Sequence, residues 1–176
     1  KCPACGEDVV KYENEVAVRC INFNCPAQIA RGIIHFASRP CMDIEGMGTS
    51  TVYSLIDNQI IKNIADIYFI ADLERMGEKS SENLINAINK SKENPLYRLI
   101  FGLGIRNIGE KASKALEKRF GDIDNIISAS FEEISEIEDF GDVMAQSVVE
   151  FFKNSDNLVL IDRLKQAGVN TKSNNA

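Results

Sequence analysis

The chain has 176 residues, of which 44% are hydrophobic and 26% charged, values that are ordinary for a folded domain. We expect neither a membrane span nor a secretory signal, because no apolar run approaches the ~20 residues that cross a bilayer. The formal net charge of −6 opposes bulk attraction to nucleic acid, so any such contact must depend on local geometry. The chain opens Lys1-Cys2-Pro3 without an initiator Met, and we expect a segment of a longer protein.

Four of the five cysteines lie within the first 25 residues: Cys2, Cys5, Cys20 and Cys25. Their order is C-x2-C, fourteen residues, then C-x4-C, a spacing typical of structural zinc sites. Alternating apolar residues between the pairs predict a β-hairpin around Glu13-Asn14. The alternatives are two disulfides or four unrelated buried thiols, but disulfides need an oxidising compartment and nothing indicates export. We therefore predict one Zn²⁺ held by four thiolates, which leave no open position for catalysis.

From Pro26 onward the sequence pattern is typical of helices. Asn94 followed by Pro95 predicts a helix start, and Ser130 with Glu133 predicts a capping box. Gly168 predicts the end of a last helix over about 156–167. The lone Cys41 lies beside apolar residues and is expected to be a small core residue.

One five-residue pattern occurs four times: an apolar residue, two mostly polar residues, a second apolar residue and a glycine. The copies are 44–48, 73–77, 105–109 and 137–141, and their glycines are 29, 32 and 32 residues apart. Seven residues after each glycine stands another apolar residue, in turn Leu55, Leu84, Leu116 and Val148. A glycine turn followed by a helix whose apolar residue packs inward two turns later predicts a helix-hairpin-helix motif. The motifs are predicted near 44–55, 73–84, 105–116 and 137–148.

The start of a helix presents N–H groups without partners and the positive end of the helix dipole, which suit a phosphate oxygen. We expect the glycine to adopt a backbone conformation closed to other residues and, lacking a Cβ, to let another molecule approach. A single copy would more often be an ordinary helical turn, but four copies in near-constant register favour DNA binding. Such contacts carry no base preference and need no positive net charge.

The four copies are not equivalent. The second residue after the glycine is Ser50, Lys79, Lys111 and Val143 in turn. The third copy is the strongest candidate, whereas the fourth lies in a run from Asp122 to Asp142 with eight acids and no Lys or Arg, so we expect it to bind poorly or to serve structure. The predicted DNA contacts are Gly46, Gly48, Thr49, Ser50, Arg75, Gly77, Lys79, Arg106, Asn107, Gly109, Lys111, Lys114 and Gly141.

A four-cysteine finger followed by four such motifs resembles the C-terminal part of bacterial NAD-dependent DNA ligases. The segment 35–39 (His-Phe-Ala-Ser-Arg) leading into 42–46, the segment 77–80 and the segment 104–109 carry the resemblance. The expected fold is mainly α, with a small four-cysteine zinc finger and its β-hairpin over 1–27 and an all-α helix-hairpin-helix domain over 28–176. The resemblance implies a DNA-binding segment that helps the parent enzyme encircle DNA and seal nicks during replication and repair.

In that family, a lysine in a Lys-x-Asp-Gly motif takes AMP from NAD, and this sequence contains no such motif. The resemblance therefore implies no catalytic residue here, with NAD and Mg²⁺ used only by other domains of the parent enzyme. The expected partner is double-stranded or nicked DNA, bound by a monomer without sequence preference in the bacterial cytoplasm. Two alternatives stay open: a DNA-binding module of a repair nuclease or junction-processing factor, and a protein-interaction scaffold whose acidic fourth motif recruits a basic partner.

Removal of zinc is predicted to unfold the first 25 residues and to leave most of the helical signal intact, because the four thiolates lie only in that segment. Circular dichroism with and without a chelator measures this. An equal loss of structure throughout the chain would mean that the finger and the helices form one cooperative unit.

Overall fold

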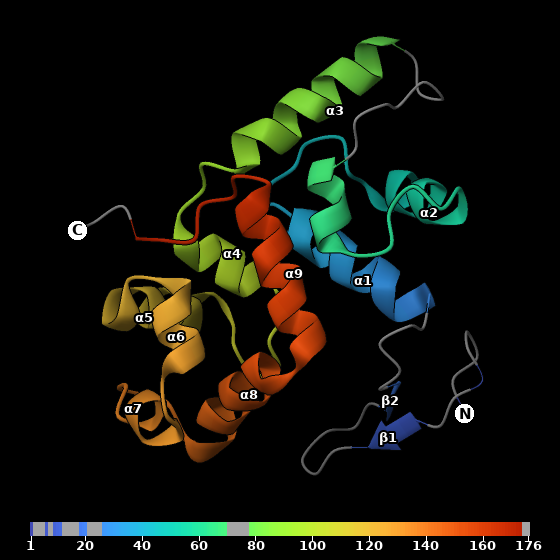
Figure 1. The fold of residues 1–176 in the computed structure, drawn as a ribbon. Helices are drawn as coiled ribbons and strands as arrows, with labels where there is room; N and C mark the ends of the chain where they lie inside the picture. Colours follow the sequence, from blue (N-terminus) through green and yellow to red (C-terminus); the bar gives the residue numbers. More distant parts are fainter. Residues whose placement is uncertain (2–5, 7–8, 12–17, 21–25, 70–77, 174–176) are drawn as a thin grey trace.

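The computed structural model describes residues 1–176 except 2–5, 7–8, 12–17, 21–25, 70–77 and 174–176 (Figure 1). Near the N-terminus, the strands β1 (Val9–Lys11) and β2 (Val18–Cys20) pair antiparallel, with Val9 opposite Cys20. The connection between these strands and three of the four predicted zinc ligands, Cys2, Cys5 and Cys25, lie outside the described residues. The strand pairing fits the predicted hairpin, while its turn and the zinc site stay predictions.

The rest of the described chain is helical, so the fold is mainly α as the sequence predicts. The helices are α1 (Pro26–Ala37), α2 (Thr49–Asp57), the 3-10 helix η1 (Ile64–Phe69), α3 (Glu78–Ser91), α4 (Leu96–Gly102), α5 (Glu110–Phe120), α6 (Ile123–Ser128), α7 (Phe131–Ser135), α8 (Asp142–Lys153) and α9 (Ser155–Gln166). No helix among the described residues is long and apolar enough to span a membrane.

Polar side chains cap the α-helices α6, α7 and α9. Asp122 accepts from the N–H of Asp124 at the start of α6, and Asn154 accepts from the N–H of Asp156 at the start of α9. The predicted capping box at the start of α7 is confirmed, because Ser130 and Glu133 each bond to the other's backbone N–H. The predicted last helix is also confirmed, and Gly168 follows its end with a left-handed φ of 90°.

The predicted start of α4 is wrong by one residue. Pro95 is the N-cap, Leu96 is the first helical residue, and no side chain caps this helix. The Asn94 side chain has a different partner, because its Nδ2 donates to the carbonyl oxygen of Met42 at 2.8 Å. Asn94 therefore ties the start of α4 to the loop that follows α1.

A helix precedes and a helix follows each of the four copies of the pattern in the sequence. The two helices of each motif are in contact: α1 with α2, η1 with α3, α4 with α5, and α7 with α8. The first helix of the second motif is a 3-10 helix whose start is fixed by side chains. The N–H of Lys62 donates to Asp66 Oδ2 at 2.8 Å, and the N–H of Asp66 donates to Asn63 Oδ1 at 3.1 Å.

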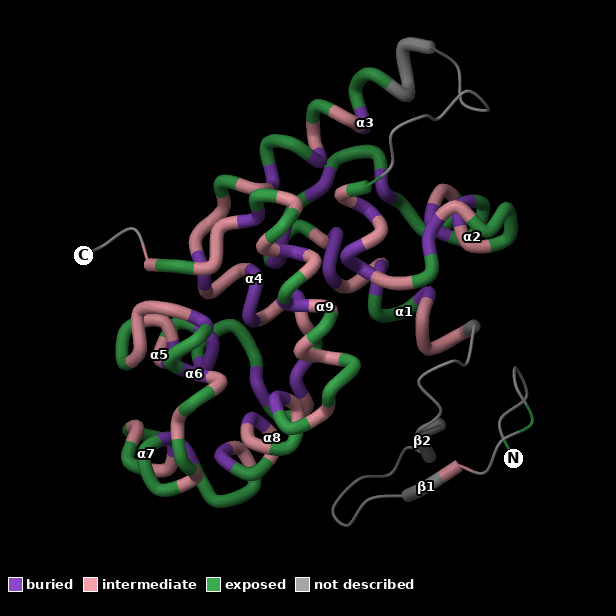
Figure 2. The backbone as a smooth tube through the Cα atoms, in the orientation of Figure 1, coloured by how far each residue is buried: buried purple, intermediate pink, exposed green. Residues whose placement is uncertain are grey.

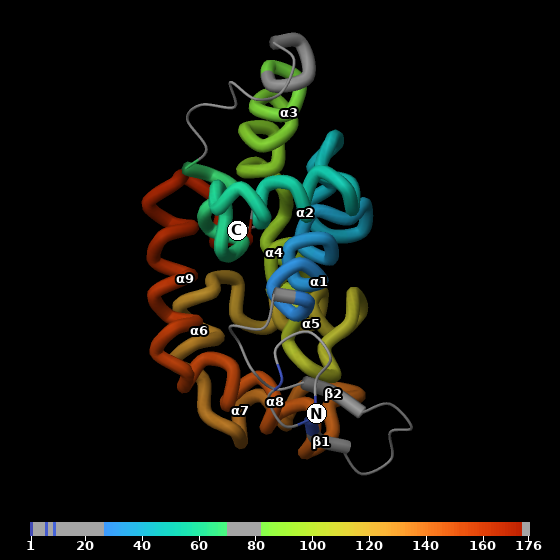
Figure 3. Tube along the Cα trace, turned by 90° about the vertical axis from the view of Figure 1, so that its right-hand side faces the viewer, coloured from blue at the N-terminus to red at the C-terminus, as the bar shows by residue number. Residues whose placement is uncertain are grey.

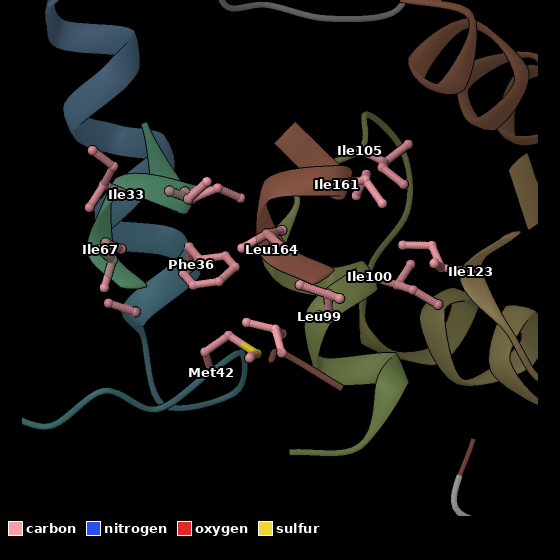
Figure 4. Packing of buried hydrophobic residues seen from close by; sticks show 14 of the residues in the cluster. Ile33, Phe36, Met42, Ile67, Leu99, Ile100, Ile105, Ile123, Ile161 and Leu164 are labelled. Carbon is pink, nitrogen blue, oxygen red and sulfur yellow. The ribbon is translucent and has the colours of Figure 1, made fainter. Parts of the chain in front are cut away.

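One hydrophobic cluster joins residues of all four motifs. Phe36 of α1, Leu99 of α4 and Leu164 of α9 are buried and face one another in it (Figure 4). Buried residues concentrate where α1, α4 and α9 lie close together (Figure 2). Packing of this kind fixes the relative positions of the elements, because interiors are close-packed and tolerate little displacement.

Helix α9 connects the two halves of the helical part. Helices α1 to α4 lie in the upper half and α5 to α8 in the lower half of the views in Figures 1 and 3, with α9 running beside both. It contacts η1 and α8, and Arg163 Nη2 lies 2.6 Å from Asp66 Oδ1 on η1. The segment after α9 also packs on the lower half, where the N–H of Ile123 donates to the carbonyl of Thr171 at 3.0 Å.

Cys41 is fully buried, as the sequence predicts for a small core residue. Burial raises the pKa of its thiol, so the neutral form is favoured. Its Sγ lies 3.6 Å from His35 Nε2, which is 2.7 Å from the carbonyl oxygen of Phe101. Burial likewise raises the pKa of Tyr68 to about 12, and its hydroxyl lies 2.8 Å from that of the buried Ser91. The side chains of Cys41, His35, Tyr68 and Ser91 are thus part of the interior packing of the helices.

Candidate nucleic-acid interface

The three described hairpins close with the same backbone hydrogen bond. In each, the N–H of the second apolar residue donates to the carbonyl of the first: Met47 to Ile44 at 3.2 Å, Ile108 to Ile105 at 3.1 Å and Phe140 to Ile137 at 3.0 Å. Five of these six side chains are buried, and Ile137 is partly buried. The apolar pair of the pattern therefore fixes each turn to the core and leaves the intervening residues at the surface.

The final glycine of the pattern does not have a left-handed backbone. Gly48, Gly109 and Gly141 have φ values of −78°, −93° and −86° with extended ψ, a conformation that any residue adopts. The expectation that these glycines supply a conformation closed to other residues is therefore wrong.

The left-handed residue of each hairpin stands two positions earlier. It is Gly46 with φ 94°, Asn107 with φ 66° and Asp139 with φ 69°. A positive φ at the third residue of a four-residue turn is the property of a type II turn, and Gly, Asn and Asp tolerate it best. The turn thus explains the residue type at this third position of the pattern.

Space, rather than conformation, distinguishes the final glycines. A Cβ added to Gly48, Gly109 or Gly141 would meet no atom of the described structure within 4 Å, and all three residues are exposed. Neither the backbone nor the packing of the described residues requires glycine there. The absent side chain instead leaves the start of the following helix open to another molecule.

The helices after these glycines start without a side-chain cap. No side chain of the N-cap bonds to the first turn of α2, α5 or α8, in contrast to α6, α7 and α9. The first intrahelical bonds are donated by Val52, Ser113 and Ala145 to the carbonyls of the glycines. The preceding N–H groups and the dipole of each helix therefore point outward, where they suit an anion.

The predicted contacts of the first and third motifs lie together at these helix starts. In the first motif Gly46, Gly48, Thr49 and Ser50 are all exposed. In the third motif Asn107, Gly109, Lys111 and Lys114 are exposed and Arg106 is partly buried. In the fourth motif Gly141 is exposed. Arg75 and Gly77 lie outside the described residues, and only the backbone of Lys79, in the first turn of α3, is described.

Motifs three and four lie side by side. Asn107 Nδ2 donates to Ser147 Oγ on α8 at 3.1 Å, and Lys111 Nζ lies 3.7 Å from Asp139 Oδ2. A groove of about 360 Å³ runs between them, lined by both hairpins and by α5. Motif one meets the helix of motif two in a similar way, because a Cβ on Gly46 would lie 3.5 Å from Leu84 Cδ1. The motifs therefore occur as adjacent pairs.

Sequence reasoning missed several residues that contact the predicted DNA-binding side chains. Tyr97 of α4 lies under the Lys114 ammonium, 5.0 Å from the ring centroid, and Lys114 also pairs with Glu110 at 3.4 Å. Ser147 and Asp139 were not among the predicted contacts, although Asp139 could have been identified as the left-handed turn residue from the motif alignment. Among the described residues, no group of three His, Cys, Asp or Glu side chains could hold a metal ion.

Two protein families match parts of the chain. Residues 98–161, which run from α4 into α9, match the helix-hairpin-helix motif, and residues 1–27 match the C4 zinc finger domain of NAD-dependent DNA ligase. The fold and the exposed glycine turns thus define a helix-hairpin-helix protein.

Similar curated proteins cover almost the whole chain. The DNA ligase of Clostridioides difficile is 56% identical over 98% of this chain, and those of Caldicellulosiruptor saccharolyticus and Bacillus subtilis are 51% and 48% identical over 97% of it. The chain spans only about a quarter of these relatives, 26% of the length of each. Over nearly all of its residues the chain is therefore similar to one part of these DNA ligases, and its first 27 residues match the zinc finger of NAD-dependent DNA ligase.

Substitution of Gly109 by Ser is predicted to leave the free energy of unfolding unchanged or to raise it by roughly 0.3 kcal/mol. The extended backbone of Gly109 suits an N-cap, and the serine hydroxyl can accept from the first turn of α5. Denaturant unfolding measures the difference.

Gly104→Ser is the matched control, because Gly104 has a φ of 70° that serine adopts only with strain. It should cost on the order of 1–2 kcal/mol. An equal loss of stability in both variants would contradict the argument that only external space keeps position 109 a glycine.

Proposed function

We propose that this chain is the DNA-binding segment of an NAD-dependent DNA ligase and that it holds duplex DNA by the sugar–phosphate backbone. The observation that carries the proposal is the set of exposed, uncapped helix starts behind Gly48, Gly109 and Gly141. Each offers N–H groups and a helix dipole to a phosphate, with no side chain in the way. Phosphate contacts position a protein on DNA without reading its bases, so binding is independent of sequence.

The third motif makes the main contact in this proposal. Lys111 is 92% exposed beside the helix start, and Lys114 is exposed one turn further along α5. Arg106 and Asn107 lie in the preceding hairpin. The first motif contributes through backbone groups and the hydroxyls of Thr49 and Ser50, and the second through Arg75, Gly77 and Lys79. These side chains act locally, which reconciles DNA binding with a net charge of −6.

Adjacent motifs suit a double-stranded partner. Motifs three and four are in direct contact through Asn107 and Ser147, and motif one lies against the helix of motif two. Two phosphate-binding turns held at a fixed distance can each take one strand across the minor groove. The parent enzyme would then encircle the duplex and seal nicks, as a monomer in the bacterial cytoplasm.

A structural zinc ion completes the N-terminal segment in this proposal. The match to a C4 zinc finger spans 1–27 and therefore includes Cys2, Cys5, Cys20 and Cys25. The backbone pairing of Val9 with Cys20 fits a hairpin between the two cysteine pairs. Four thiolates suit Zn²⁺ and leave no position for water or substrate. NAD and Mg²⁺ belong to the parent enzyme, where adenylate transfer needs residues that this chain lacks.

The affinity for duplex DNA is predicted to fall with salt. If two or three motifs neutralise phosphates, log affinity should decrease with log salt concentration at a slope of roughly −3 to −6. Fluorescence anisotropy of a labelled duplex, intact or nicked, measures the slope. A flat response would favour the protein-interaction scaffold instead.

Loss of the third motif's contacts is predicted to weaken binding to every duplex sequence alike. Lys111→Ala removes a phosphate partner, and Gly109→Val fills the space above α5 with a side chain that its extended backbone accepts. Val143→Ala is the matched control, because Val143 is the equivalent residue of the fourth motif and is 68% exposed. A change in base preference in the Lys111→Ala or Gly109→Val variant would contradict the proposal that the third motif contacts only the sugar–phosphate backbone of DNA.

A further inference from the structure

The basic α5 and the acidic fourth motif are joined by ion pairs at both ends of α5. Near the start of the helix, Lys111 Nζ lies 3.7 Å from Asp139 Oδ2, and near its end Arg119 Nη2 lies 3.3 Å from Glu136 Oε2. The first pair stands at the uncapped helix start, whereas the second lies two turns away. Both are exposed, with 92% and 72% of the Lys111 and Asp139 side chains accessible, so an ionic ligand can displace either partner.

The charge of Asp139 is not required by the shape of its hairpin. Asp139 occupies the left-handed position that is Gly46 in the first motif and Asn107 in the third. Glycine and asparagine adopt this conformation without a charge. The hairpin is anchored instead by Phe140, which is buried, and by its own backbone hydrogen bond to Ile137.

The contact between the two motifs does not depend on the ion pair either. Asn107 Nδ2 donates to Ser147 Oγ at 3.1 Å, and this neutral bond links the third hairpin to α8. The groove between the motifs is lined by Gly109 and Lys111 on one side and by Glu138 and Asp139 on the other. A carboxylate oxygen of Asp139 is thus placed at the side chain that would bind a phosphate.

We propose that Asp139 substitutes for a DNA phosphate on Lys111 in the free protein, so that the fourth motif limits the affinity of the third. The inference rests on the proposed function. To bind Lys111, a DNA phosphate must displace the carboxylate of Asp139. The displaced carboxylate then lies beside the phosphate and repels it. Because Lys111 is already neutralised, its transfer to DNA releases fewer counterions than a free lysine would. Asp139 therefore lowers both the affinity and the salt dependence of binding.

The test compares the zinc-loaded 176-residue chain with Asp139→Asn and Asp139→Gly in anisotropy titrations of a labelled duplex over a range of salt concentrations. Both substitutions remove the charge and keep a residue that accepts a positive φ, which protects the fold. We expect affinity to rise about 2- to 5-fold at low salt, the range of an exposed ion pair. The salt slope should become more negative by up to about 0.9, the contribution of one lysine.

Two further variants separate this effect from a general change of charge. Glu136→Gln removes one acid of the same motif and breaks the pair with Arg119, away from the helix start, and should change affinity and slope little. In a Lys111→Ala background, Asp139→Asn should lose most of its effect. An equal gain from Glu136→Gln, or an undiminished gain without Lys111, would overturn the inference.

The outcomes also separate this inference from the proposed function. If the unsubstituted chain binds DNA with a steep salt slope and neither Asp139 variant changes affinity or slope, the inference fails and the proposed function stands. If the unsubstituted chain shows no salt-dependent binding to duplex DNA, the proposed function fails and the inference fails with it.

Discussion

Burial of two apolar residues on either side of a tight turn determines the surface chemistry of each motif. Ile105 and Ile108 are buried three positions apart, and the backbone bond between them closes the hairpin. Because the turn is fixed at both ends, the next residue, Gly109, emerges at the surface in an extended conformation and starts α5. The same anchoring operates before α2 and α8. A helix start that is exposed, uncapped and rigidly placed follows from packing beneath it.

Capping distinguishes two groups of three helices. Asp122, Ser130 and Asn154 satisfy the first turns of α6, α7 and α9 from within the protein. Glycines precede α2, α5 and α8 and provide no such bond. A protein gains stability from a side-chain cap, so three glycines at N-caps forgo stabilisation that the same chain obtains elsewhere. Helix starts of this kind are suited to an external anion.

Pairing of motifs three and four brings the basic and the acidic stretch of the sequence together. The basic stretch of the third motif and the acidic stretch of the fourth are neighbours in space, joined through Lys111 with Asp139 and Arg119 with Glu136. Asp124, which belongs to the acidic stretch, also forms an ion pair with Lys165 of α9. Charges that are separated along the chain thus partly neutralise one another in the fold. The net charge of −6 says little about the potential at any one hairpin.

The amino-acid sequence alone determined the helical class, the four repeats, the capping box at Ser130 and the buried character of Cys41. These depend on local periodicity, capping and hydrophobicity, which act within a few residues of chain. Only the tertiary structure decided that Asn94 bonds to Met42 instead of capping α4, that Asn107 bonds to Ser147, and that Asp139 lies against Lys111. Partners of this kind depend on how distant segments pack, and a repeat pattern does not specify that packing.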